Sequence, residues 1–214
     1  MVSSLWPPAV LGGAELYASK LADHLEERGH TVGVVTLGVD GPRVVAKGRP
    51  WPYRLDDFAD SAAWRRVVFH LRDLYDPTAA RLIRRAITSF APDVVHSHAI
   101  AGLSAAVLSA PDRMGVPHVH HVHDYWLLCR RTTMVRGSGV ACEQRCLSCR
   151  SIAAVHMLTT RGHVGDVCVA VSEATADVHR ELRALRSPVR VVHNAGAAAP
   201  PTRPPRATGA AVVF

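Results

Sequence analysis

Short valine-rich runs alternate along this chain with segments of helical periodicity, and this alternation constrains the fold more than any other feature. Because the runs are continuously apolar, they predict strands that are buried on both faces. They cover residues 31–37, 93–96, 117–122, 166–172 and 189–193. Strands separated by helices in this way predict a doubly wound α/β domain with a mainly parallel sheet. A chain of 214 residues is long enough to build one such domain around a sizeable core.

End signals delimit two of the intervening helices. The first ends at Gly29, and its apolar face repeats at helical spacing through Ala14, Tyr17, Ala18, Leu21 and Leu25. The second opens at Asp76-Pro77, an N-cap residue followed by proline in the first helical turn. One side of this second helix is apolar, and the other side contains Arg81, Arg84 and Arg85.

A further amphipathic helix is predicted for residues 64–75. Its apolar stripe consists of Trp64, Val67, Val68, Leu71 and Tyr75, and the opposite side contains Arg65, Arg66 and Arg72. Such a helix can lie on an anionic membrane surface. The alternative, which we favour from the sequence, is a surface helix whose stripe packs on the sheet.

Charge and hydropathy restrict the kinds of binding partner and the cellular location that the sequence predicts. The formal net charge of +7 indicates an anionic partner. We expect no nucleic-acid partner, because no zinc-finger, RNP-like or lysine-rich segment is present. No apolar run approaches the ~20 residues that span a bilayer, and residues 1–8 lack the features of a secretory signal. The expected location is therefore cytoplasmic.

The composition changes near residue 195. Residues 1–195 are expected to form the Rossmann-like domain, and residues 196–208 a linker rich in proline and alanine. Residues 209–214 are apolar again and resemble the first strand of a further domain. The alternative is a flexible tail with a hydrophobic tip.

A paired-glycine turn precedes the first helix. Gly12 and Gly13 follow Pro7-Pro8 and lead directly into the helix. Glycines at this place let the backbone approach a ligand closely, and the helix N-terminus offers free N–H groups to an anion. The pattern is not G-x-G-x-x-G, so a dinucleotide-binding fingerprint is not supported.

Histidines gather at the ends of two predicted strands. His118 and His120 should point to one face of their strand and His121 and His123 to the other, so the four cannot share one metal ion while the strand lasts. For His118, His120 and His121 we favour a hydrogen-bonded structural role. His123 differs because the strand should end there and expose it.

Four cysteines occur within residues 129–149. Cys129, Cys142, Cys146 and Cys149 have the spacing C-x12-C-x3-C-x2-C. Four thiolates suit a tetrahedral structural zinc ion, which we favour as the interpretation. Reduced thiols, a disulfide and an iron–sulfur cluster are the alternatives. Cys168, within a predicted strand, is expected to be a core residue.

The order and spacing of seven motifs resemble those of retaining glycosyltransferases of family 4, which have the GT-B fold. The motifs are P-P-x-x-x-G-G-A-E, L-x-x-R-G-H-x-V-x-V-x-T, P-D-V-V-H-x-H, G-V-P, H-D-Y-W-L-L-C, V-x-V-S-E-x-T and V-V-H-N. They run in register through residues 5–194. The resemblance implies that this chain is the N-terminal, acceptor-side domain of a two-domain enzyme, and that most contacts to the donor come from a second domain.

The resemblance also implies roles for individual residues. Gly12 and Gly13 would lie against the donor diphosphate, and His123 would contact the transferred sugar as the catalytic histidine. The remaining substrate-side residues in the matching motifs are His98, Asp124, Ser172 and Asn194, of which Asn194 marks the crossover to the second domain. The donor would be a nucleotide diphosphate sugar, the acceptor a hydroxyl group, and no cofactor is expected for catalysis.

Two other functions remain open at this point. The chain could be a non-catalytic partner, such as one subunit or a fragment of a split transferase that pairs with the missing domain in cis or in trans. It could also be a small Rossmann-like nucleotide-binding protein. On the transferase interpretation the chain alone should be inactive, and the second domain, the donor and the acceptor are its expected partners. An anionic surface at the inner membrane face stays open as a further partner, through the helix of residues 64–75.

Overall fold

The computed structural model describes residues 1–48, 62–136, 138–182 and 185–194, and the expected linker and apolar run after residue 195 lie outside this part. The strands are β1 (Val34–Leu37), β2 (Val44–Gly48), β3 (Val95–Ser97), β4 (His118–Val122), β5 (Val167–Ala170) and β6 (Val189–Val191). The helices are α1 (Gly13–Glu27), α2 (Ala63–Leu74), α3 (Pro77–Phe90), α4 (Ser109–Arg113), α5 (Leu147–Thr160) and α6 (Glu173–Arg180), with a 3-10 turn η1 (Ala105–Val107).

All the paired strands run parallel, which confirms the predicted fold class. β2 pairs with β1, and β3, β4, β5 and β6 pair in that order. Val2 joins the two halves, because it forms parallel bridges to both Val35 and Ser97. The N-terminal segment therefore lies in the centre of the sheet, which is the arrangement of a doubly wound fold. The five predicted strands correspond to β1, β3, β4, β5 and β6, whereas the edge strand β2 was not predicted.

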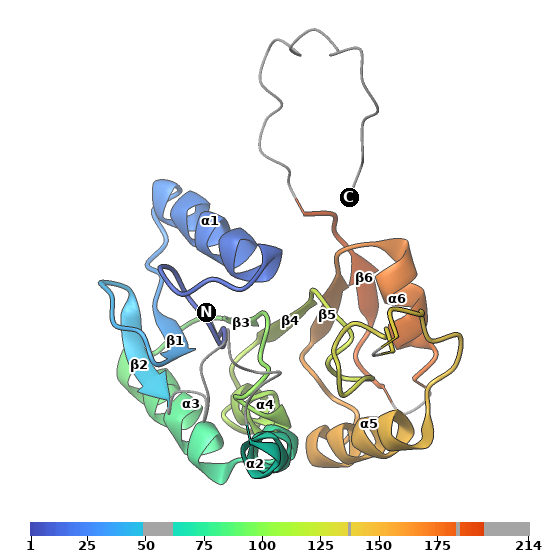
Figure 1. The fold of residues 1–214 in the computed structure, drawn as a ribbon. Coiled ribbons are helices and arrows are strands. Elements are labelled where there is room, and N and C mark those ends of the chain that lie inside the picture. The colour runs from blue at the N-terminus through green and yellow to red at the C-terminus, as the bar shows by residue number, and fades with distance from the viewer. Residues whose placement is uncertain (49–61, 137, 183–184, 195–214) are drawn as a thin grey trace, which may run out of the picture.

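Helices cover both faces of this sheet. α1 lies on one face, and α3, α4 and α5 lie on the other (Figure 1). The core between the sheet and α3–α5 includes fully buried side chains of Ile83, Leu103, Leu108, Leu127 and Leu128. Cys168 is fully buried in β5, as expected of a core residue. Among the described residues, none of the helices combines the length and apolar character that crossing a bilayer requires.

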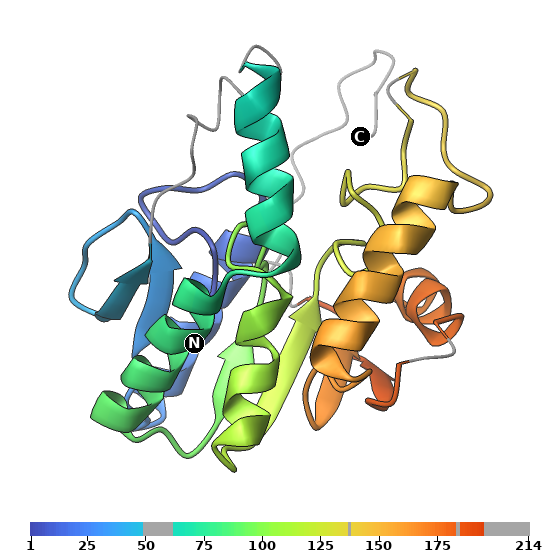
Figure 2. The ribbon, with the colours of Figure 1, turned by 90° about the horizontal axis from the view of Figure 1, so that it is seen from below.

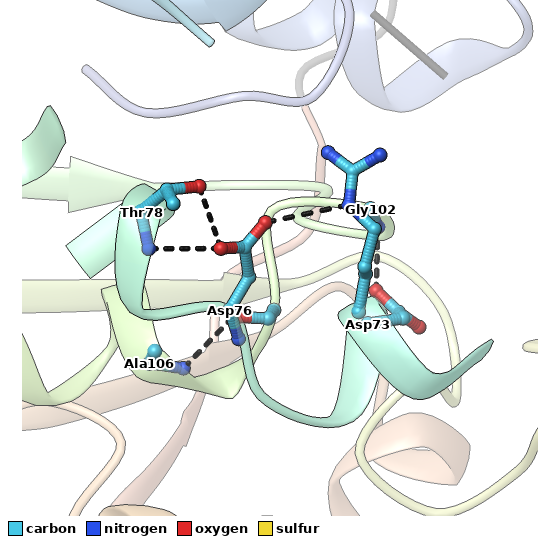
Figure 3. A network of polar contacts seen from close by, with 7 residues as sticks. Asp73, Asp76, Thr78, Gly102 and Ala106 are labelled. Atoms are coloured by element: carbon cyan, nitrogen blue, oxygen red, sulfur yellow. Dashed lines mark hydrogen bonds and ion pairs between the residues drawn. The ribbon is translucent and has the colours of Figure 1, made fainter. Parts of the chain in front are cut away.

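The predicted start of α3 at Asp76-Pro77 is confirmed. The Asp76 carboxylate accepts hydrogen bonds from the Thr78 N–H at 2.8 Å and the Thr78 hydroxyl at 2.6 Å (Figure 3). The Asp76 N–H in turn donates to Ser104 Oγ at 3.0 Å. The cap thus fixes the helix start and also ties the junction of α2 and α3 to the loop that follows β3.

The prediction that the apolar stripe of α2 packs on the sheet is wrong. Trp64, Val67 and Leu71 of the predicted stripe are 62%, 56% and 63% exposed, and the helix projects from the rest of the fold (Figure 2). The side that faces inward contains Phe69 and Asp73 instead. Periodicity locates an apolar stripe but cannot tell what covers it. Asp73 can point inward because two hydrogen-bond donors meet its carboxylate there.

Candidate functional site

The pleat of β3 and β4 sorts the histidines onto two faces, as predicted. On one face the Ser97 hydroxyl lies 2.7 Å from His118 Nε2 and 2.9 Å from His120 Nδ1. Both histidines are buried and hydrogen-bonded, which agrees with a structural role. On the other face His121 and His123 stack at 4.3 Å between ring centroids, under α1. We expected His121 to be hydrogen-bonded as well, but neither of its ring nitrogens has a partner among the described residues.

His123 lies directly after β4 and pairs with His98. His98 Nδ1 and His123 Nε2 are 3.2 Å apart, so one ring donates to the other. His98 is buried, whereas His123 is half-buried. Burial lowers the pKa of His123 to about 3, and the neighbouring His121 contributes in the same direction. At neutral pH the His123 ring is therefore uncharged and can form hydrogen bonds, but it is a poor proton acceptor for general base catalysis.

Asp124 follows His123 at the same edge of the sheet. Its carboxylate accepts a hydrogen bond from the Trp126 N–H at 2.9 Å. Burial raises the pKa of Asp124 to about 6, and the nearby Glu15 carboxylate adds to the rise although the Trp126 hydrogen bond opposes it. Asp124 and Glu15 therefore lie close enough to interact, which places the first turn of α1 beside this strand end.

The Gly12-Gly13 turn begins α1. Gly12 is the N-cap residue, and its N–H donates to the Glu15 carboxylate at 2.9 Å. A Cβ at Gly13 would meet no atom within 4 Å, and one at Gly12 would meet only Glu15 Oε2 at 3.9 Å. The backbone of Gly12 is extended, a conformation open to any residue. Neither packing nor backbone strain requires these glycines, which leaves open space for a ligand over the helix N-terminus.

Two residues of α1 were not identified as site residues from the sequence. Glu15 is almost fully buried, and a capping-box pattern with glycine at the N-cap was the signal that could have identified it. Tyr17 packs its ring against His121 and His123 with centroid distances of 5.0 and 5.3 Å. Because Tyr17 follows the glycine turn by one helical turn, the structure brings that turn and His123 to one place.

Ser172 and Asn194 follow β5 and β6 at the same edge of the sheet. Ser172 is the N-cap of α6 and accepts a hydrogen bond from the Thr175 N–H at 3.2 Å. Asn194 is exposed after β6. Among the described residues, neither forms a hydrogen bond with the histidines. The structure therefore brings His98, His123 and Asp124 to one edge of the sheet, beside the helix that Gly12 and Gly13 begin, and leaves Ser172 and Asn194 along the neighbouring strand ends.

The loop after His123 is anchored by a buried carboxylate on α2. Asp73 accepts hydrogen bonds from the Trp126 indole N–H at 2.7 Å and from the Gly102 backbone N–H at 2.5 Å, of which the second is drawn in Figure 3. Burial raises the pKa of Asp73 to about 7, although both hydrogen bonds act against the rise. Trp126 also stacks on His156 at 4.1 Å. Asp73 thus links α2 to the loops that follow both histidine-bearing strands.

Two of the four clustered cysteines are in contact. Cys129 and Cys149 Sγ are 3.7 Å apart, too far for a disulfide. Two sulfur ligands of a tetrahedral zinc ion would be separated by about 3.8 Å, because each Zn–S bond is about 2.3 Å. Cys146 forms a hydrogen bond with Ser148, and none of the four cysteines forms a disulfide. The four sulfurs do not gather on one point among the described residues. The zinc site therefore stays a prediction.

Comparisons with known proteins agree with this arrangement. The family model for Glycosyltransferase Family 4 matches residues 11–195, most of the chain. A Klebsiella pneumoniae protein described as "Uncharacterized 42.6 kDa protein in cps region" is 27% identical over 199 residues. The match covers 87% of this chain and 52% of that relative, so the chain spans about half of the relative's length. From its fold, its motif order and the extent of the family match, this chain belongs to glycosyltransferase family 4 and corresponds to an N-terminal domain of the GT-B type.

Proposed function

We propose that this chain is the acceptor-side half of a retaining glycosyltransferase that moves a sugar from a nucleotide diphosphate sugar to a hydroxyl group. The observation that supports it best is that the open Gly12-Gly13 turn begins the helix whose Tyr17 ring packs against an uncharged, half-buried His123. The family match supports the reaction class. A relative from a cps region favours a product within polysaccharide or glycolipid synthesis over a natural-product glycan.

The glycine turn would stabilise the leaving group. Negative charge grows on the diphosphate as the glycosidic bond breaks, and N–H groups at a helix N-terminus stabilise an anion there. Glu15 already accepts the Gly12 N–H, so the free donors are those of Gly13 and Ala14. The absence of side chains at both glycines gives a diphosphate room to reach these donors.

His123 would orient the transferred sugar through a hydrogen bond. A ring whose pKa is about 3 carries almost no positive charge at neutral pH and takes up a proton weakly. His98 fixes the ring by bonding its Nε2 atom, which leaves Nδ1 for the sugar. We therefore assign His123 a positioning and polarising role, and the leaving phosphate as the acceptor of the hydroxyl proton.

The exposed stripe of α2 supports a peripheral membrane location on the cytoplasmic face. Trp64, Val67 and Leu71 are more than half exposed, and the Arg65 guanidinium lies 5.4 Å from the Trp64 ring centroid. Arg130 lies near enough to His70 of α2 to lower the pKa of that ring, after the larger effect of burial. Apolar side chains beside arginines match an anionic lipid surface, where a lipid-linked acceptor would be presented.

A second domain is needed for turnover. We propose that the chain alone is inactive, because most donor contacts would come from that domain in cis or in trans. The test is to supply a C-terminal donor-binding domain and compare wild type with His123→Ala. Loss of one well-placed transition-state contact should reduce kcat by ~10²–10³. His24→Ala, an exposed histidine on α1, is the matched control and should keep wild-type turnover.

Near-normal turnover of His123→Ala would remove that residue from the mechanism. Robust transfer by the homogeneous isolated chain would contradict the need for a second domain. Tight 1:1 nucleotide binding by the isolated chain, without any transfer after complementation, would instead favour a nucleotide-binding protein.

A further inference from the structure

Three imidazoles from β3 and β4 approach one another on the sheet face under α1. His96 and His98 are two residues apart and share this face of β3, and His121 occupies it on the adjacent strand β4. One ring nitrogen from each lies within 4.8 Å of those of the other two. The sequence did not reveal this trio, because alternation within β4 separates His118 and His120 from His121 but says nothing about which side chains arrive from β3.

Four ring nitrogens of this trio lack the hydrogen bonds that buried imidazoles normally have. His96 Nε2, His98 Nε2 and both nitrogens of His121 are buried without a partner among the described residues. His98 and His121 are each only 1% exposed. A buried polar group left without a partner costs about 1–3 kcal/mol. Both nitrogens of His121 bear this cost. On the opposite face His118 and His120 each have one nitrogen on the Ser97 hydroxyl, and of these two rings only His118 has a nitrogen, Nδ1, that is buried without a partner among the described residues.

We propose that His96, His98 and His121 bind a divalent transition metal, with Zn²⁺ as the natural occupant. Neutral imidazole suits zinc, nickel and copper, and three histidines with one open position are an established zinc ligand set. With metal–nitrogen bonds of about 2.0–2.1 Å, the ligand atoms would be about 3.4 Å apart, so nitrogens that now lie within 4.8 Å of one another must approach by at most about 1.4 Å.

The side chains can make this adjustment at low cost. The ring planes lie within 32° of parallel, so each ring must turn to direct a lone pair at a common point. His96 Nε2 and the two nitrogens of His121 have no hydrogen bond to break when they turn. His96 and His121 also line a cavity of about 1010 Å³ beneath α1, which offers a metal ion a route to the trio.

The metal would set the protonation pattern of the candidate catalytic histidine. If His98 Nε2 binds the ion, the proton of that ring must be on Nδ1, which lies 3.2 Å from His123 Nε2. His98 then donates and His123 Nε2 accepts, so the proton of His123 is on its Nδ1. A ligand histidine held by a second group in this way is typical of zinc sites. This site goes beyond the transferase function and does not depend on it.

The test is metal binding by the full chain with the competing thiols removed. Cys129, Cys142, Cys146 and Cys149 are replaced together by serine, and Co²⁺ and Zn²⁺ are titrated with calorimetric and absorption readouts. We expect one equivalent of Co²⁺, with absorption that lacks thiolate-to-cobalt charge transfer. His121→Ala and His96→Ala should each weaken binding at least tenfold, in line with the 10–100-fold loss seen even for second-shell changes. His24→Ala should bind as the parent does.

A second readout separates ligation from a structural effect. Nitrogen-15 NMR of the histidine rings should show the His123 proton on Nδ1 once Zn²⁺ is bound. If circular dichroism shows that His121→Ala does not fold, metal binding by His96→Gln decides between ligation and a structural effect. This variant should fold, because His96 is only half-buried. The proposal is overturned if the chain with the four serine replacements takes up no metal, if both histidine variants bind as the parent does, or if His24→Ala abolishes binding.

Discussion

Asp73 should make the stability of this domain depend on pH in a direction opposite to that of carboxylates whose pKa is lowered by ion pairs or hydrogen bonds. Burial raises the pKa of Asp73 from 3.8 to about 7 in the folded protein. The folded state therefore holds a proton that the unfolded state releases above its own pKa. The stabilisation is fully present below pH 3.8 and is lost as the pH rises through about 7. The stability contribution of Asp73 therefore changes mainly between pH 3.8 and about pH 7.

The size of the effect follows from the shift. At about 1.36 kcal/mol per pKa unit, a rise from 3.8 to about 7 corresponds to roughly 4 kcal/mol in all. Between pH 5 and pH 8, linkage makes the loss of unfolding free energy about 2–3 kcal/mol. Asp73→Asn removes the titration but keeps the shape of the side chain. The difference in unfolding free energy between the two proteins should therefore change by about 2–3 kcal/mol between these pH values.

Urea unfolding at pH 5 and pH 8 measures this double difference. Comparing two proteins is necessary because the buried histidines, whose pKa values are lowered, change stability with pH in the opposite direction. Those contributions cancel in the comparison. Asp93→Asn, at an exposed position, is the matched control and should show no double difference. Equal pH dependence in wild type and Asp73→Asn would refute the reasoning, because Asp73 would then be ionised in its buried site at pH 5.

Further predictions concern the cap, the exposed helix and the cysteines. Asp76→Ala removes the N-cap of α3 and should lower the unfolding free energy measured by urea by about 1 kcal/mol, whereas Asp76→Ser should restore most of it. Trp64→Glu with Leu71→Glu should abolish sedimentation with vesicles that contain anionic lipid, while leaving the circular dichroism spectrum unchanged; binding equal to wild type would exclude α2 as the contact surface. Protein prepared without chelator should contain one equivalent of zinc more than its Cys129→Ser, Cys149→Ser variant, measured by elemental analysis; equal zinc content in the two proteins, with four freely titrating thiols in the wild type, would favour reduced cysteines.

The sequence predicted features that depend on neighbouring residues along the chain. Valine-rich runs located five strands, and Asp76-Pro77 located the start of α3, because burial on both faces and helix capping leave local patterns. The edge strand β2 was missed, since it is only partly buried and lacks a continuous apolar run. Alternation within β4 also predicted which histidines share a face, as the contacts of Ser97 confirm.

Features that depend on two distant segments could not be predicted in this way. The inward side of α2 is fixed by Asp73, whose donors come from Gly102 and Trp126, and no local pattern announces that meeting. The trio of His96, His98 and His121 likewise forms only when two strands pair. Glu15 was visible in the sequence as part of a motif, but its burial beside Asp124 was not.

Asp73, Asp124 and the histidines after β3 and β4 together suggest how the loop after β4 is held in place. His123 is useful as an uncharged hydrogen-bonding group only if water stays away from it, and burial is the cause that lowers its pKa. The same burial would leave the loop after β4 without support, because its polar groups lose water as well. Asp73 supplies that support by accepting the Trp126 indole N–H, and Asp124 does so by accepting the Trp126 backbone N–H. Burial thus lowers the pKa of His123 and raises the pKa of both carboxylates, and because Asp73 holds Trp126 we expect its loss to affect both the stability and the loop that follows His123.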